Sequence, residues 1–139
     1  GYAGTFGDTL PVGGEFTKRQ KDLLNHMRET LRLTKAMLKP GMRGHEIDVP
    51  GRAYYEKHNL EKYIVCPFAH SIGLMEAEAP FFGPNGDFRL RPGMTVMVDI
   101  SFFGHPELYG GRIETGYVIT EDGCRPMSSK MDAHFMEDL

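Results

Sequence analysis

The chain has 139 residues, of which 40% are hydrophobic and 25% are charged, and its formal net charge is −3. This length suits one domain with a modest core, and the composition is ordinary for a globular protein. No basic run stands out, which argues against nucleic acid as a partner. No apolar stretch approaches the ~20 residues that span a bilayer, and no signal peptide is visible. We therefore expect a cytoplasmic protein without a membrane partner.

Two further features bear on the state of the chain. Cys66 and Cys124 are far apart and form no CxxC motif, so two reduced thiols are favoured, while a disulfide between them stays open. The chain begins with Gly1 rather than Met, and the segment 1–6 reads like the middle of a strand region. We therefore expect a processed or truncated chain.

The first half of the chain predicts two helices. Residues 1–14 suggest a strand followed by a turn, and Thr17 with Gln20 then forms a capping box for a long helix. Apolar or small residues recur behind it at spacings of three and four, which predicts one buried stripe. The stripe consists of Leu24, Met27, Leu31, Thr34 and Leu38. Lys39-Pro40-Gly41 should end this helix.

A second helix is expected between residues 45 and 58. Its start is placed near Pro50, where the missing N–H costs nothing, and its end at His58-Asn59. Ala53, Tyr54 and Lys57 fit one face of it.

The second half of the chain predicts strands. Residues 63–65 are a short candidate, residues 75–93 are mostly loop, and residues 95–100 and 113–120 are stronger strands. Glu121-Asp122-Gly123 is a turn signal. Helices followed by strands favour an α+β fold, with helices on one face of a mainly antiparallel sheet.

Three residues could carry chemistry: His70, Asp99 and Glu114. Each has an ordinary structural explanation, as a hydrogen-bonded core histidine, a turn cap and a solvated surface acid. Together they say more, because Asp99 lies within an apolar strand and a buried carboxylate is costly unless it is paired or binds a cation. One imidazole and two carboxylates suit a metal ion, and they equally suit acid–base catalysis.

Four short motifs in order resemble the creatinase, aminopeptidase P and methionine aminopeptidase family. They are His70-Ser71-Ile72-Gly73-Leu74, Leu90-x-Pro92-Gly93-Met94 through Asp99, Gly111-Arg112-Ile113-Glu114, and Thr120-Glu121-Asp122-Gly123. The helix ending in Pro40-Gly41 is also similar to a family helix. The resemblance covers roughly Gly1 to Ser128. It implies the pita-bread fold, with residues 1–139 as a part of the catalytic domain that is incomplete at its N-terminus.

The resemblance also implies a site. Metallopeptidases of this family hold two divalent metals with two Asp, one His and two Glu side chains. His70 matches the His, Glu114 matches the last Glu, and Asp99 stands where the family usually has Glu. His70, Asp99 and Glu114 are therefore the expected metal ligands and catalytic residues.

The chain departs from the family pattern at other positions. Thr5 stands where the second Asp is expected, the first Asp would precede Gly1, and Ala77 replaces a second His. We therefore expect one divalent metal (Mn, Co, Zn or Fe) or none. Creatinase works without metal, and His58-Asn59-Leu60 followed by Tyr63 resembles its branch of the family.

Two functions follow from the resemblance. The first is a hydrolase of C–N bonds similar to Xaa-Pro peptidases or creatinase, metal-dependent or metal-free, that acts on a small molecule or short peptide. The second is a non-catalytic binding module that kept the fold and lost its metal ligands. By analogy with creatinase, we also expect a homodimer.

Overall fold

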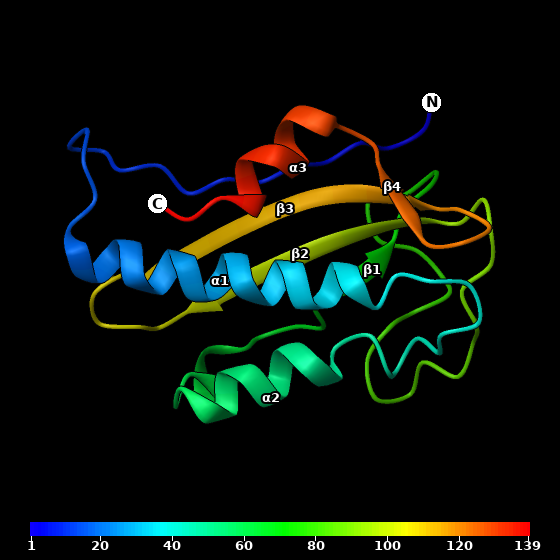
Figure 1. Cartoon of the computed structure of the whole chain (residues 1–139), viewed down its shortest axis with the longest axis horizontal. Helices are drawn as coiled ribbons and strands as arrows, with labels where there is room; N and C mark the ends of the chain where they lie inside the picture. The colour runs from blue at the N-terminus through cyan, green and yellow to red at the C-terminus, as the bar shows by residue number, and fades with distance from the viewer.

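The computed structural model describes residues 1–139. In chain order the elements are α1 (Lys18–Ala36), α2 (Val49–Lys57), the 3-10 helix η1 (Glu61–Tyr63), β1 (Ala69–Ser71), β2 (Thr95–Phe103), β3 (Gly110–Ile119), β4 (Cys124–Pro126) and α3 (Ser129–Met136). The four strands form one antiparallel sheet in the order β1-β2-β3-β4. The helices lie along this sheet, with α1 crossing β2 and β3 in the view of Figure 1. The predicted α+β class is confirmed.

Helix α1 begins as its sequence predicts. The Thr17 hydroxyl accepts from the Gln20 backbone N–H, and the Gln20 side chain accepts from the Thr17 N–H, so both halves of the capping box are formed. All five residues of the predicted stripe are buried. The helix ends at Ala36, before the predicted stop at Lys39-Pro40-Gly41.

Helix α2 packs against α1 through a glycine. Its buried residues are Gly51 and Tyr55, whereas the predicted face of Ala53, Tyr54 and Lys57 is half-buried or exposed. A Cβ atom at Gly51 would lie 2.9 Å from the Thr30 methyl group of α1 and 2.9 Å from a ring carbon of Phe68. Glycine is therefore what allows this close approach.

Alternation along β2 separates two faces of the sheet. Its core residues Val96, Val98, Ile100 and Phe102 are at most 1% exposed and pack in the helix-covered core. The residues between them, Met97, Asp99 and Ser101, project to the opposite face, because successive side chains of a strand alternate. The polar site is built on this second face.

Several elements differ from the sequence-based expectation. The predicted strand at residues 63–65 is wrong: the 3-10 turn η1 takes its place, followed by one isolated bridge between Ile64 and Phe102. The strand expected within residues 1–14 is also wrong, because this segment forms no strand and joins the sheet by one isolated β-bridge, between Gly7 and Glu114. Cys66 and Cys124 are both free, as expected. No helix has the length and apolar character to cross a membrane.

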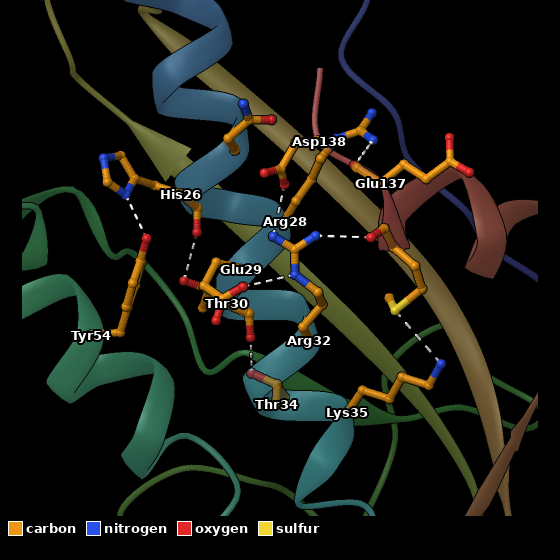
Figure 2. Close-up of polar contacts among 12 residues, drawn as sticks. His26, Arg28, Glu29, Thr30, Arg32, Thr34, Lys35, Tyr54, Glu137 and Asp138 are labelled. Carbon is orange, nitrogen blue, oxygen red and sulfur yellow. Dashed lines mark hydrogen bonds and ion pairs between the residues drawn. The ribbon is translucent and has the colours of Figure 1, made fainter.

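Helix α3, which the sequence did not predict, is tied to α1 by basic side chains (Figure 2). Arg28 donates to the carbonyl oxygens of His134 (2.5 Å) and Glu137 (2.6 Å). Arg32 donates to the Met136 carbonyl at 3.0 Å. Residues 134–138 are thus held along the outer side of α1.

Candidate active site

Neighbouring strands bring the three predicted residues to one face. His70 on β1 pairs with Met97 on β2, and Asp99 on β2 pairs with Glu114 on β3. Because paired residues and every second residue share a face, His70, Asp99 and Glu114 all lie on the side opposite the helices. Asp99 is 3% exposed and Glu114 is 1% exposed, so two carboxylates are buried on this face.

His70 makes its closest acidic contact with Glu114. Its Nε2 atom lies 3.3 Å from Oε1 of Glu114 and 3.7 Å from Oε1 of Glu76. Its Nδ1 atom lies 3.1 Å from the carbonyl oxygen of Ser71. The hydrogen bond with Glu114 raises the pKa of His70, against the opposing effect of burial.

The other oxygen of Glu114 faces a different set of groups. The Thr5 hydroxyl donates to Oε2 at 3.2 Å, and Arg112 Nε lies 3.6 Å from the same atom. The backbone of Glu114 also exchanges two hydrogen bonds with Gly7, at 2.9 and 3.1 Å. Thr5, which stands where the resemblance expects an Asp, therefore reaches the site, but it offers a hydroxyl rather than a carboxylate.

Asp99 is held by Arg112. The Arg112 Nε atom donates to Oδ1 of Asp99 at 2.9 Å, and its terminal nitrogen donates to Oδ2. The Ser101 hydroxyl donates to Oδ1 at 2.7 Å. The hydrogen bond with Asp99 is the largest cause of the raised pKa of Arg112. Asp99 thus has its own permanent counter-ion.

Glu76 is a member of the cluster that the sequence did not single out. Ligand atoms of His70, Glu76 and Glu114 all lie within 4.8 Å of one another. Glu76 comes from the loop after β1, six residues beyond His70 and next to Ala77. The available signal was an acid beside Ala77, the position where the family resemblance implies a second His, in a loop that returns to β1 through the bridge between Ser71 and Glu78.

An apolar cavity of about 420 Å³ adjoins this cluster. It is lined by Gly4, Thr5, Phe6, Ile72, Met97, Thr115, Gly116, Met127, Ser128 and Met131. None of these residues is charged. The cavity shares Thr5 with the Glu114 carboxylate and Met97 with the His70 strand pair, so it begins where the polar cluster ends.

Comparison with known proteins places this arrangement in a family. Residues 1–121 match metallopeptidase family M24. The chain belongs to this family. The match includes the segments that carry Thr5, His70, Asp99 and Glu114.

Two similar proteins match most of the chain. It is 30% identical over 128 residues to the uncharacterized peptidase YqhT of Bacillus subtilis, covering 92% of this chain and 36% of that protein. It is 26% identical over 120 residues to an Xaa-Pro dipeptidase of Pyrococcus furiosus, covering 86% of this chain and 34% of that protein. The chain therefore spans about a third of the length of these relatives.

Solved structures give the same fold. An Xaa-Pro dipeptidase from Bacillus anthracis superposes with a TM-score of 0.83 at 29% identity, covering 92% of this chain and 36% of that one. A prolidase from Pyrococcus furiosus gives a TM-score of 0.82 at 23% identity, covering 99% and 38%. The chain has the fold of this part of those proteins, and the expected pita-bread fold is confirmed.

Proposed function

We propose that this chain carries part of the active site of a hydrolase that cleaves C–N bonds in short peptides. The observation that supports it most is the contact of 3.3 Å between His70 Nε2 and Glu114 Oε1, on a buried acidic face beside an apolar cavity. Membership of M24 makes the chain part of a peptidase family. The substrate is our proposal, because the chain spans about a third of the Xaa-Pro dipeptidase it resembles.

His70 serves this reaction in one of two ways, which exclude each other because both use the lone pair of Nε2. In a metal-free site, neutral His70 takes a proton from the attacking water at Nε2 and returns it to the leaving nitrogen. Glu114 then orients the ring and stabilises its charged form, as the raised pKa of His70 indicates. In a metal-dependent site, His70 must stay neutral to bind the ion.

The side chains present fit one divalent ion better than two. A bound ion would polarise the scissile carbonyl group. His70 and Glu114 are side chains that would hold it, and the resemblance adds Asp99 as a predicted ligand. A second ion lacks a carboxylate at Thr5, whose hydroxyl is already donated to Glu114.

The cavity next to the cluster suits an apolar side chain of the substrate. Met97, Met127 and Met131 contribute thioether side chains to its wall. Methionine is unbranched and polarizable, so it adapts to apolar groups of different shape. A charged side chain would lose its hydration there without gaining a partner. We therefore favour short peptides with an apolar residue beside the scissile bond.

The test is an assay of the full-length protein and its His70→Ala variant. The substrates are Xaa-Pro dipeptides with apolar and charged first residues, together with small guanidino and amide compounds. His45→Ala is the matched control, because His45 lies in the segment before α2 and its ring contacts the Gly86 carbonyl oxygen rather than a residue of the site. His105 is unsuitable, because it is buried against Tyr63 and Phe102.

We expect His70→Ala to lower kcat/KM by at least ~100-fold, in line with the usual contribution of an acid–base group, and His45→Ala to leave it unchanged. Turnover that survives His70→Ala would refute the role of His70. If a folded wild-type protein cleaves none of the compounds, the binding-module alternative, which Thr5 favours, replaces the hydrolase. The homodimer and the cytoplasmic location stay predictions.

A further inference from the structure

We infer that the chain binds one divalent metal ion through His70, Glu76 and Glu114, and that Asp99 is not a ligand of this ion. The inference concerns the metal-dependent form of the proposed function. It replaces a ligand that the family resemblance implies with Glu76, to which that resemblance assigns no role. Its test measures metal binding directly and does not depend on activity.

The first argument is the proton on His70. A carbonyl oxygen only accepts, so the 3.1 Å contact with Ser71 requires Nδ1 of His70 to carry the hydrogen. In the neutral ring the lone pair is then on Nε2. That atom faces carboxylate oxygens of Glu114 and Glu76. Three electron-rich atoms converge there, so the arrangement needs a positive charge, supplied by a proton on Nε2 or by a cation.

Several features favour a divalent ion. The bond from Nδ1 to a backbone carbonyl is the arrangement that orients metal-bound histidines. Tetrahedral ligands at ~2.1 Å from an ion lie about 3.4 Å apart. The observed separations are 3.3 Å from Nε2 to Glu114 and 3.7 Å from Nε2 to Glu76. The Glu76 side chain is 55% exposed, so it can move to close the remaining gap at little cost.

The second argument is the distribution of the other contacts. Oε2 of Glu114 accepts a hydrogen bond from the Thr5 hydroxyl and forms an ion pair with Arg112, which leaves Oε1 to face His70 and Glu76. Asp99 has both oxygens engaged, by Arg112 on each and by Ser101 on one. A guanidinium held in this two-pronged way is a full counter-charge. Asp99 therefore has neither a free oxygen nor an unbalanced charge to offer an ion.

The ligand set predicts which ions bind. One imidazole and two carboxylates suit Mn²⁺, Fe²⁺, Co²⁺ and Zn²⁺, whereas soft ions prefer sulfur. Three protein ligands leave at least one position of the ion open, as catalytic sites require.

The test titrates the full-length protein with Zn²⁺ and Co²⁺ by calorimetry at pH 7.5, and follows Co²⁺ by visible absorption. We expect one equivalent per chain. Glu76→Gln should weaken binding at least ~10-fold, which corresponds to 1.4 kcal/mol, and should change the Co²⁺ spectrum. Glu78→Gln is the matched control, because it lies in the same loop and its side-chain oxygen can still accept from Met75 N–H. Asp99→Asn should bind as wild type does.

The inference is overturned by an absence of binding, by two tightly bound equivalents, or by wild-type affinity in Glu76→Gln. If Asp99→Asn does not fold, the comparison of Glu76→Gln with Glu78→Gln decides the question alone. The two proposals fail separately. One bound equivalent without turnover supports this site and refutes the hydrolase, whereas turnover by a protein that binds no added metal supports the hydrolase and refutes this site.

Discussion

Asp99 and Glu114 are register partners on β2 and β3, yet Arg112 binds their two carboxylates unequally. Arg112 donates two hydrogen bonds to Asp99 but only approaches Glu114, at 3.6 Å, and the nearest basic side chain to Glu114 is His70, at 3.3 Å. Like charges directly opposite on a sheet destabilise it. Arg112 therefore compensates the charge of Asp99 more fully than that of Glu114, and the rest of the compensation of Glu114 depends on protonation of His70 or on a bound ion.

Arg112→Ala should lower the free energy of unfolding by about 1–3 kcal/mol, because it leaves the Asp99 carboxylate buried and unpaired. The effect is below that of a fully buried pair, because the Arg112 side chain is 50% exposed. Urea denaturation measures it. The double variant Arg112→Ala/Asp99→Asn should recover part of the loss, and exposed Arg91→Ala should change stability by less than ~0.5 kcal/mol. A double variant no more stable than the single one would contradict this account.

Gly51→Ala should destabilise the protein by about 1–3 kcal/mol, although alanine is the better helix former. The new methyl carbon would lie 2.9 Å from both Thr30 and Phe68, and overpacking of this kind outweighs a propensity gain of at most ~1 kcal/mol. Thermal unfolding measures the change. Gly123→Ala is the control, since nothing lies within 4 Å of its added carbon. A stabilised Gly51→Ala protein would mean that α1 and α2 are less closely packed than described.

Arg28 and Arg32 should differ in their importance for the C-terminal segment, although both reach it from α1 (Figure 2). Arg28 is 3% exposed and binds two carbonyl oxygens of residues 134 and 137. Arg28→Met should cost about 2–3 kcal/mol, because two partly buried carbonyl oxygens lose a charged donor. Arg32→Met should cost about 1 kcal/mol or less, since its ion pairs are partly exposed. Hydrogen exchange in α3 should rise more in the first variant, and equal effects would contradict this ranking.

The pair of histidines between α1 and α2 predicts a pH effect. Burial, followed by the neighbouring His58 at a ring distance of 4.7 Å, lowers the pKa of His26. Below the unfolded value of ~6.5 the unfolded chain takes up the proton more readily, so this contribution to stability is lost as pH falls through 6.5 toward the lowered folded value. His26→Gln should therefore lose less stability than wild type between pH 7.5 and 5.5. The difference stays below about 1 kcal/mol, because water reaches the ring.

Urea denaturation at several pH values measures this difference. His58→Gln should reproduce part of the effect, because it removes the neighbouring imidazole while His26 stays. A His26→Gln protein that loses as much stability as wild type, or more, between pH 7.5 and 5.5 would contradict the assignment.

Local signals predicted the parts of the fold that local chemistry decides. The capping box of Thr17 and Gln20, the buried stripe of α1 and the two long strands follow from hydrogen-bonding groups and periodicity near in sequence. Helix α3 was missed because its sequence is moderately polar and its stabilising contacts come from residues far away in the sequence. Lys35 pairs with Asp132 at 2.7 Å, and the Tyr117 hydroxyl donates to the same residue at 2.8 Å.

The candidate site was also predicted only in part from the sequence. The family motifs singled out His70 and Glu114, which are in contact, and Asp99, which shares their face. They could not assign the ion pair of Asp99, because Arg112 precedes Glu114 by two residues and reaches across to the neighbouring strand. Glu76 was missed because a loop, with no periodic pattern of its own, carries it back toward His70.

The alternation of side chains along β2 has a consequence for how this chain tolerates length changes. Every second residue from Val96 to Phe102 belongs to the core, and the residues between them face the site. Inserting a single residue into β2 would exchange the two sets beyond the insertion, sending Asp99 toward the helix-covered core and turning Val98 toward the face that carries the site. A two-residue insertion would keep both sets on their own faces. We therefore expect β2 to tolerate a two-residue insertion and not a one-residue insertion. The one-residue insertion should prevent folding and disrupt the site at the same time.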